Sequence, residues 1–413
     1  MLARHDGQVV LVGGTIPGER VRARVDRVGR GVAFASVLEI LEPAPDRRPP
    51  AGDPLCGGNV YAHVAYTAQP AIKREVLRDA LRHGGRIEWP ADLPVAASPE
   101  HAYRMRARLH VRDGRAGFFR EGTHDLCDAR CTAQLLPAAL DAIERLIAGT
   151  PKPWLDAIEA IELAENIAGD QRTLHLLWSS RVRPPRSMPP ETWTLDALAP
   201  GVTGVSMDNP LSGRARTVSG SPTVSDPVSR LIEAPVSGEP QLQHHASSFF
   251  QANRFLLPQL VAAVSRHVGS GPIVDLYAGV GLFAVTLAAS GRDRITAIEG
   301  DPSSAHDLRI NAEPFARSLR VEHSSVEQYL MGFSAAADTT LIVDPPRTGM
   351  SREALASIIA VRAARIVYVS CDVATLARDL RRLLESGYTL AHLEAFDLFP
   401  NTAHIESLAV LTR

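Results

Sequence analysis

Lysine is nearly absent from this chain of 413 residues, which holds two lysines, Lys73 and Lys152, against 42 arginines. Such a bias follows either from the codon usage of a GC-rich genome or from bidentate recognition of phosphate groups, and composition alone favours the first explanation. Acidic and basic side chains nearly cancel, with a formal net charge of −2. Because most nucleic-acid-binding domains are basic, the whole-chain charge does not indicate a nucleic-acid partner.

Cysteine is also scarce. Cys56, Cys127, Cys131 and Cys371 are too few for a disulfide scaffold of this length and are typical of a reducing compartment. The longest uncharged apolar stretch, residues 276–289, is shorter than the ~18 residues that a membrane span requires. The N-terminus lacks the apolar core of a secretory signal. We therefore expect a cytoplasmic protein without a membrane segment, built from two or three domains of roughly 100–200 residues.

Residues 1–45 alternate short β-branched runs with turn signals, which indicates a small β-barrel of the oligonucleotide-binding kind. The expected strands cover 8–14, 20–28 and 31–41. A proline-rich link follows over 43–54. Residues 69–83 have the apolar periodicity of a helix, with Pro70 in its first turn.

Residues 101–120 predict a β-hairpin that turns at Asp113-Gly114. The segment holds six arginines against one acid, a local charge of +5. By the period of two, three of these arginines share one strand face, and two phenylalanines beside them offer stacking surfaces for bases. RNA contact and a plain solvated face fit this pattern about equally. The candidates for RNA contact are Arg104, Arg106, Arg108 and Phe118.

Residues 179–240 are rich in proline, serine and glycine and predict loops with short strands. From about residue 243 buried strands alternate with helices, which is typical of a doubly wound α/β sheet. The expected strands are 272–277, 294–299, 318–323, 340–344 and 365–370.

A glycine turn follows the first of these strands. Gly279 and Gly281 let the backbone approach a ligand, and Glu299 stands at the tip of the next strand, where an acid binds ribose hydroxyls. The loop lacks the third glycine of the dinucleotide fingerprint and the lysine of a phosphate-binding loop. This favours a ligand with ribose and adenine but no phosphates, namely S-adenosylmethionine.

Three further residues lie at strand ends of the same half. Asp344 opens an Asp-Pro-Pro-Arg sequence, and Arg347 takes the place of the aromatic residue that is common in amino-methylating enzymes. Cys371 precedes a helix expected over 373–384, whose dipole would lower the thiol pKa from about 8.5, although a buried structural cysteine fits equally. Glu406 begins the last apolar strand, as a solvated strand end or as a general base.

At these residues the chain resembles the RNA uracil-5-methyltransferases that make 5-methyluridine in tRNA and 23S rRNA. The similarity covers essentially the whole chain, with the matching segments in the family's order. They are FFQANRF (249–255), DLYAGVGLFAVTLA (275–288), AIEGDP (297–302), DPPRTGM (344–350), VSCDVATLARDL (369–380) and FPNTAHIE (399–406).

The resemblance implies a class I, Rossmann-like methyltransferase domain over 241–413. It also implies a TRAM-like, oligonucleotide-binding β-barrel over 1–45 and a linker with a central α+β RNA-binding domain over 46–240. The TRAM resemblance begins at Met1 without the usual first strand, so we expect an incomplete barrel or an upstream start. A TRAM-like barrel favours 23S rRNA over tRNA as the substrate. No obligate protein partner is implied.

Site residues carry over position by position. The resemblance implies S-adenosylmethionine contacts at Gln251, Tyr277, Gly279, Gly281, Glu299 and Asp344, a nucleophile at Cys371, a base at Glu406 and an RNA contact at Arg347. Addition of a thiolate to C6 of uracil makes C5 nucleophilic toward the sulfonium methyl group, and a base then removes the C5 proton. This chemistry needs no metal.

Many members of the family hold an iron–sulfur cluster on four cysteines. Here Cys56 and Cys131 match two of those positions, whereas Pro50 and Asn59 replace the other two. Because such a cluster needs four thiolates, we expect none. Cys127 has no implied role, and a zinc site with Cys131 lacks a second ligand pair.

Two alternatives remain. Cytosine-C5 methyltransferases usually add a Pro-Cys motif, and no cysteine follows a proline here. The other alternative is an RNA-binding protein or chaperone whose methyltransferase site is idle.

Overall fold

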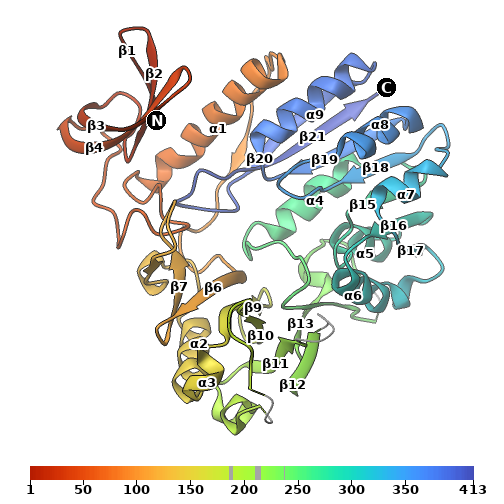
Figure 1. Cartoon of the computed structure of the whole chain (residues 1–413). Coiled ribbons are helices and arrows are strands. Elements are labelled where there is room, and N and C mark those ends of the chain that lie inside the picture. The colour runs from red at the N-terminus through yellow and green to blue at the C-terminus, as the bar shows by residue number, and fades with distance from the viewer. Residues whose placement is uncertain (186–188, 210–214, 237) are drawn as a thin grey trace.

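The computed structural model describes residues 1–185, 189–209, 215–236 and 238–413, which form three larger sheets with their helices (Figure 1). The N-terminal sheet has the order β1-β2-β4-β3. Its strands are β1 (Leu2–His5), β2 (Gln8–Gly13), β3 (Arg20–Gly29) and β4 (Val32–Glu42). The three strands expected in this region are confirmed. The sheet does not close into a barrel, because no pairing joins β1 to β3 among the described residues.

The middle sheet has seven strands in the order β12-β11-β10-β9-β6-β7-β8. They are β6 (Arg106–Arg112), β7 (Arg115–Phe119), β8 (Leu126–Cys127), β9 (Ile158–Glu165), β10 (Arg172–Trp178), β11 (Val202–Asp208) and β12 (Ala215–Gly220). Helices α2 (Pro137–Gly149) and α3 (Lys152–Leu155) pack on it, and β13 (Thr223–Pro227) pairs with β14 (Gln241–His245) beside it. The predicted hairpin is confirmed. Asp113 and Gly114 both have positive φ, 50° and 70°, which the turn of a two-residue hairpin requires.

The C-terminal sheet has eight strands in the order β17-β16-β15-β18-β19-β21-β20-β5. They are β5 (Val95–Ala96), β15 (Ile273–Leu276), β16 (Ile295–Glu299), β17 (Leu319–His323), β18 (Thr340–Val343), β19 (Arg365–Ser370), β20 (Thr389–Phe396) and β21 (Glu406–Thr412). All five predicted strands are present and pair in parallel, whereas β21 is antiparallel to its two neighbours. The doubly wound α/β architecture is therefore confirmed.

Helices cover both faces of this sheet, because alternate residues of each buried strand point to opposite sides. One layer packs around Ile273 and the other around Val274. The first layer consists of α4 (Leu257–His267), α5 (Leu282–Ala289) and α6 (Pro302–Ala312). The second consists of α1 (Gln69–Ala80), α7 (Val326–Met331), α8 (Arg352–Val361) and α9 (Val373–Glu385). A π-helical turn over Leu81–Gly85 continues α1.

Two elements from the N-terminal part of the chain belong to the C-terminal sheet. Strand β5 adds to its edge beside β20, and α1 packs against α9 through Leu77 and Leu81. The ammonium group of Lys73 lies 2.5 Å from Asp397, and neither side chain is exposed. The packing unit therefore reaches beyond the boundary expected at residue 241 and takes in residues 69–96. No helix in the described part of the chain is long and apolar enough to cross a membrane.

Candidate active site

The glycine turn after β15 is held in a backbone conformation that side chains resist. Tyr277, Gly279 and Gly281 have φ of 62°, 56° and 95°. At Gly281, which caps α5, a Cβ atom would lie 2.6 Å from Cδ1 of Leu308, so the helix could not pack there with a larger residue. The turn leaves a narrow pocket, lined among others by Gln251, Tyr277, Gly279 and Asp344, four of the six residues expected at the cofactor.

The other two expected cofactor residues support this pocket. Gly281 begins the helix behind it, and Glu299 ends β16 with both carboxylate oxygens engaged. The amide of Gly279 donates to Oε2 of Glu299 over 2.7 Å, and the amide of Asp301 donates to Oε1 over 2.7 Å. Glu299 therefore fixes the glycine turn, and burial raises its pKa. Each oxygen keeps a lone pair for a ribose hydroxyl.

Buried carboxyl groups gather beside the pocket. Gln251 donates a hydrogen bond from Nε2 to Oδ2 of Asp344 over 3.2 Å, and burial raises the pKa of Asp344 to about 7. Asp275 is fully buried and its Oδ1 has no hydrogen-bond partner among the described residues. Burial and the charge of Asp344 raise the pKa of Asp275 well above its usual value. A ligand with a sulfonium and an ammonium group suits this site, because its positive charge stabilises ionised carboxylates.

Cys371 opens onto a second, larger pocket of about 570 Å³. The structure brings together there four residues that the sequence predicted from distant segments: Cys371 after β19, Arg347 after β18, and Arg104 and Phe118 of the hairpin region. Arg108 also lines it. A single cavity therefore contains the predicted nucleophile and most of the predicted RNA contacts.

The expected low pKa of Cys371 is wrong for this structure. Burial, followed by the charges of Glu406 and Asp344, raises the thiol pKa to about 12, and the charge of Arg347 opposes this. The dipole of α9 does not lower the thiol pKa enough to offset burial. The side chain of Asp372 already accepts hydrogen bonds from the amides of Ala374 and Thr375 at the start of the helix. Asp372 is thus the N-cap of α9.

Glu406 begins β21 as predicted, but it is no solvated strand end. Its side chain is 1% exposed, and its Oε1 has no hydrogen-bond partner among the described residues. Burial and the charge of Asp344 raise its pKa well above the usual value. A buried carboxyl group with a free oxygen and a raised pKa is typical of groups that exchange protons at functional sites.

The three arginines of the hairpin region share one face, as the period of two predicts, but they differ in exposure. Arg104 donates to Gln134 over 2.8 Å and lies over the ring of Phe118. Arg106 donates to the carbonyl of Ala246 over 3.4 Å. Arg108 is 56% exposed and forms an ion pair of 2.7 Å with Glu162. Of the three, Arg108 is the most available to a phosphate.

The aromatic surface differs from the expected one. Phe118 is 6% exposed and packs in the core of the middle domain, although its edge reaches the pocket. Phe119 stacks on His110 at 3.7 Å between ring centroids. His404 also lines the pocket, 3.2 Å from the guanidinium of Arg347. The sequence did not predict His110 or His404 as site residues; His404 falls in the matched segment 399–406, whereas His110 falls in none of the matched segments.

A disulfide bond joins two cysteines that the sequence analysis considered separately. Cys56 and Cys127 form a disulfide with 5.6 Å between their Cα atoms, which ties the loop before α1 to β8. Disulfide bonding between cysteines was not expected, and it gives Cys127 a structural role. Cys131, by contrast, is a free and exposed thiol beside Gly52. Cys56 is therefore not available as a cluster ligand in this state.

Comparisons with known proteins agree with this arrangement. The family model described as tRNA (Uracil-5-)-methyltransferase matches residues 239–413, and the TRAM domain model matches residues 1–38. The chain is 30% identical to the 23S rRNA (uracil(1939)-C(5))-methyltransferase RlmD of Pseudomonas putida, over 99% of this chain and 90% of the relative. It is 32% identical to the RlmD protein of Alkalilimnicola ehrlichii, over 100% of this chain and 93% of the relative.

A solved structure shares the fold along the whole chain. It is the tRNA (uracil-54, C5)-methyltransferase of Pyrococcus abyssi in complex with S-adenosyl-L-homocysteine. The TM-score is 0.74 at 22% identity, with 99% of this chain and 96% of that chain covered. With relatives of this identity and coverage, the chain belongs to the family of S-adenosylmethionine-dependent RNA uracil-C5 methyltransferases.

Proposed function

We propose that this protein methylates C5 of a uridine in RNA through a covalent bond between Sγ of Cys371 and C6 of the uracil. One observation carries the proposal. Asp344 lines the narrow glycine-turn pocket, and its charge, together with that of Glu406, acts on the thiol of Cys371 in the larger pocket. The methyl group of S-adenosylmethionine and the uracil ring would therefore meet between the carboxyl groups of Asp344 and Glu406.

The side chains fit the steps of such a reaction. The thiolate of Cys371 adds to C6, and the electron pair of the C5–C6 bond moves toward the O4 carbonyl. S-adenosylmethionine supplies a methyl group that is electrophilic because it is carried by a sulfonium. After C5 is methylated, Glu406 accepts the C5 proton, the double bond reforms and the thiolate leaves. Arg347 supplies the positive charge that lowers the thiol pKa against burial.

The substrate that we propose is 23S rRNA. Relatives named for a uridine of 23S rRNA match along nearly the whole chain, and a TRAM domain model matches the N-terminal residues 1–38. A cytoplasmic location follows from an rRNA substrate. A flipped or single-stranded uridine would enter the larger pocket, because C6 is inaccessible to a thiol within a stacked duplex.

The test separates the nucleophile from the base. Glu406→Gln should form the C6 adduct but fail to release it, giving an RNA–protein band that survives denaturing electrophoresis. Cys371→Ala and the double variant should give no such band and no 5-methyluridine. Mapping 5-methyluridine by mass spectrometry in 23S rRNA and tRNA from a deletion strain identifies the target.

Retained 5-methyluridine formation by Cys371→Ala would overturn the proposal. Binding of RNA without binding of S-adenosylmethionine, measured by calorimetry on the unmodified protein, would instead favour an idle site in an RNA-binding protein.

A further inference from the structure

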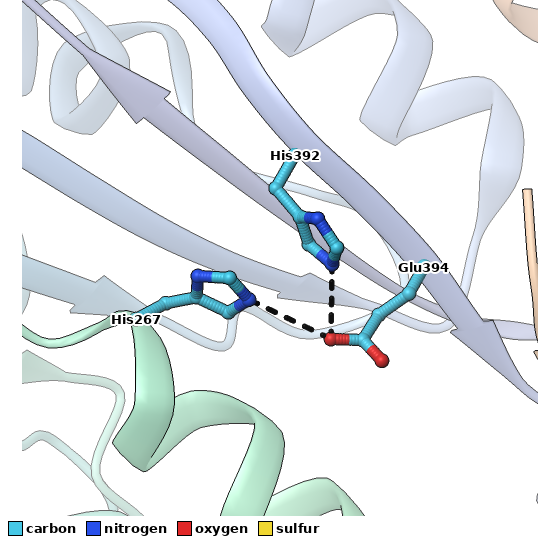
Figure 2. Close-up of side chains that lie close together, drawn as sticks. All are labelled: His267, His392 and Glu394. Carbon is cyan, nitrogen blue, oxygen red and sulfur yellow. Dashed lines mark hydrogen bonds and ion pairs between the residues drawn. The ribbon is translucent and has the colours of Figure 1, made fainter. Parts of the chain in front are cut away.

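Two histidines and a glutamate converge at the edge of the C-terminal sheet, away from the glycine turn (Figure 2). His267 is the last residue of α4. His392 and Glu394 lie two positions apart on β20, so their side chains leave the same face of that strand. This is the face that carries Phe396 and Leu408 into the core beneath α4.

The distances between the donor atoms suit a single metal ion. Nε2 of His392 lies 3.1 Å and Nε2 of His267 lies 3.7 Å from Oε1 of Glu394. One ligand atom from each of the three residues lies within 4.8 Å of the others. A tetrahedral zinc ion with bonds of about 2.1 Å holds its ligands ~3.4 Å apart, and both histidine–glutamate distances lie close to that value.

We infer that His267, His392 and Glu394 bind a divalent transition metal, with Zn²⁺ as the ion that best fits two imidazoles and one carboxylate. The three residues are half-buried, which leaves the donors shielded yet reachable from solvent. Glu394 also lines a pocket of about 360 Å³, so its carboxyl group borders open space. Three protein ligands with one open position are typical of a zinc site that retains a water molecule.

Two arginines, Arg266 and Arg365, place positive charge near the three donors, but they oppose the binding of a cation only weakly. Arg266 donates to Glu394 over 3.3 Å, but its side chain is 61% exposed and is free to turn into solvent. Arg365 of β19 acts on His267 from a greater distance through its charge. The bound metal would replace Arg266 as the partner of Glu394.

Metal binding here would join the C-terminal end of α4 to the penultimate strand of the sheet. The site therefore acts on the stability of the methyltransferase domain and takes no part in the chemistry at Cys371. Because the three donors come from elements that already pack together, the metal adds a cross-link to a preformed site and is not required for folding.

The experiment measures Zn²⁺ binding by equilibrium dialysis on the full chain, with Cys131→Ser and Cys371→Ser as background because free thiols also bind zinc. We expect one Zn²⁺ per chain. His267→Ala, His392→Ala and Glu394→Gln should each weaken the affinity roughly tenfold or more. In the background protein Co²⁺ should give the visible absorption of a tetrahedral site, and Zn²⁺ should raise Tm.

A matched control exists at the N-terminal sheet. His5 and Asp6 form a histidine–carboxylate pair at 3.5 Å, which is exposed and has no third donor among the residues that the structure describes. His5→Ala should keep full Zn²⁺ affinity. The inference is overturned if the background protein binds no Zn²⁺, or if His267→Ala and Glu394→Gln bind Zn²⁺ as tightly as His5→Ala does. Glu394→Gln keeps the size of the side chain, so the test does not depend on the folding of an alanine variant.

Discussion

Gln251 and Asp344 are joined by a hydrogen bond of 3.2 Å that links the segment after β14 to the end of β18. The bond favours the ionised carboxylate, but burial outweighs it, and the pKa of Asp344 rises to about 7. A carboxyl group that titrates near neutrality therefore stands in the wall of the glycine-turn pocket.

The affinity for S-adenosylmethionine should rise as the pH increases from 6 to 8. Asp344 loses its proton across this range, and the carboxylate attracts the positive charge of the ligand, so a protonated Asp344 binds the ligand less well. Calorimetric titrations at several pH values measure the effect. Asp344→Asn should bind S-adenosylmethionine weakly with a flat pH profile.

An exposed carboxylate provides the control for this prediction. The side chain of Asp293 is 76% exposed and lies outside the pocket. Asp293→Asn should keep the rise in affinity between pH 6 and 8. If Asp344→Asn keeps that rise as well, another group controls binding.

Alkylation of Cys371 by iodoacetamide should be slow at pH 8 and should still be accelerating at pH 10, because its pKa is raised to about 12. Glu406→Gln removes one of the negative charges that raise this pKa, so alkylation should become faster although turnover is lost. Arg347→Gln removes an opposing positive charge and should slow alkylation. Mass spectrometry of the modified peptide in a Cys131→Ser background measures the rates.

The opposite directions of the two substitutions make this prediction specific. A loosened pocket would speed alkylation in both variants. Acceleration of both would therefore contradict an electrostatic effect of Glu406 and Arg347 on the thiol.

Arg108→Gln should weaken RNA binding and reduce the slope of log affinity against log salt by about one, because one phosphate contact is lost. Glu162→Gln should strengthen binding, since it frees Arg108 from its ion pair. Filter binding over a range of salt concentrations measures both effects. S-adenosylmethionine affinity should not change in either variant.

Arg82 offers a close match for comparison. Its side chain is 57% exposed and lies 3.1 Å from Glu88, so it resembles Arg108 in exposure and pairing but lies outside the pocket that contains Cys371. Arg82→Gln should leave the salt slope unchanged. Equal losses in the two arginine variants would show a general charge effect.

Reduction of the Cys56–Cys127 disulfide should lower the free energy of unfolding by about 4 kcal/mol, because it closes a loop of 71 residues in the unfolded chain. Urea unfolding with and without reductant measures this difference. Replacing both cysteines by alanine should remove the effect of the reductant. Cys131→Ala should not, and an equal response to reductant in the double variant would contradict the prediction.

The sequence predicted best what depends on neighbours along the chain. The five parallel strands are short runs rich in aliphatic and β-branched residues, such as 340–344, and the positive φ values at Asp113 and Gly114 follow from a local turn rule. The pKa of Cys371 was predicted wrongly, because it depends on Asp344 and Glu406, which only the folded chain brings near. The prediction considered only the dipole of the neighbouring helix, whereas burial and distant charges determine the thiol pKa in the folded chain.

The placement of α1 in the C-terminal unit was likewise not predictable. The apolar periodicity of residues 69–83 indicates a helix but not the sheet that it covers. The ion pair that fixes its position joins residues 324 positions apart. The disulfide between Cys56 and Cys127 was also not predicted, because the positions of four cysteines in a sequence do not specify which of them pair.

The position of α1 has a consequence for synthesis on the ribosome. Lys73 is made before its partner Asp397, which follows 324 residues later in the chain. Until then α1 has no sheet to cover, and its apolar side chains Leu77 and Leu81 stay exposed in the nascent chain. The docking of α1 therefore waits until the late strands of the sheet that it covers have been made.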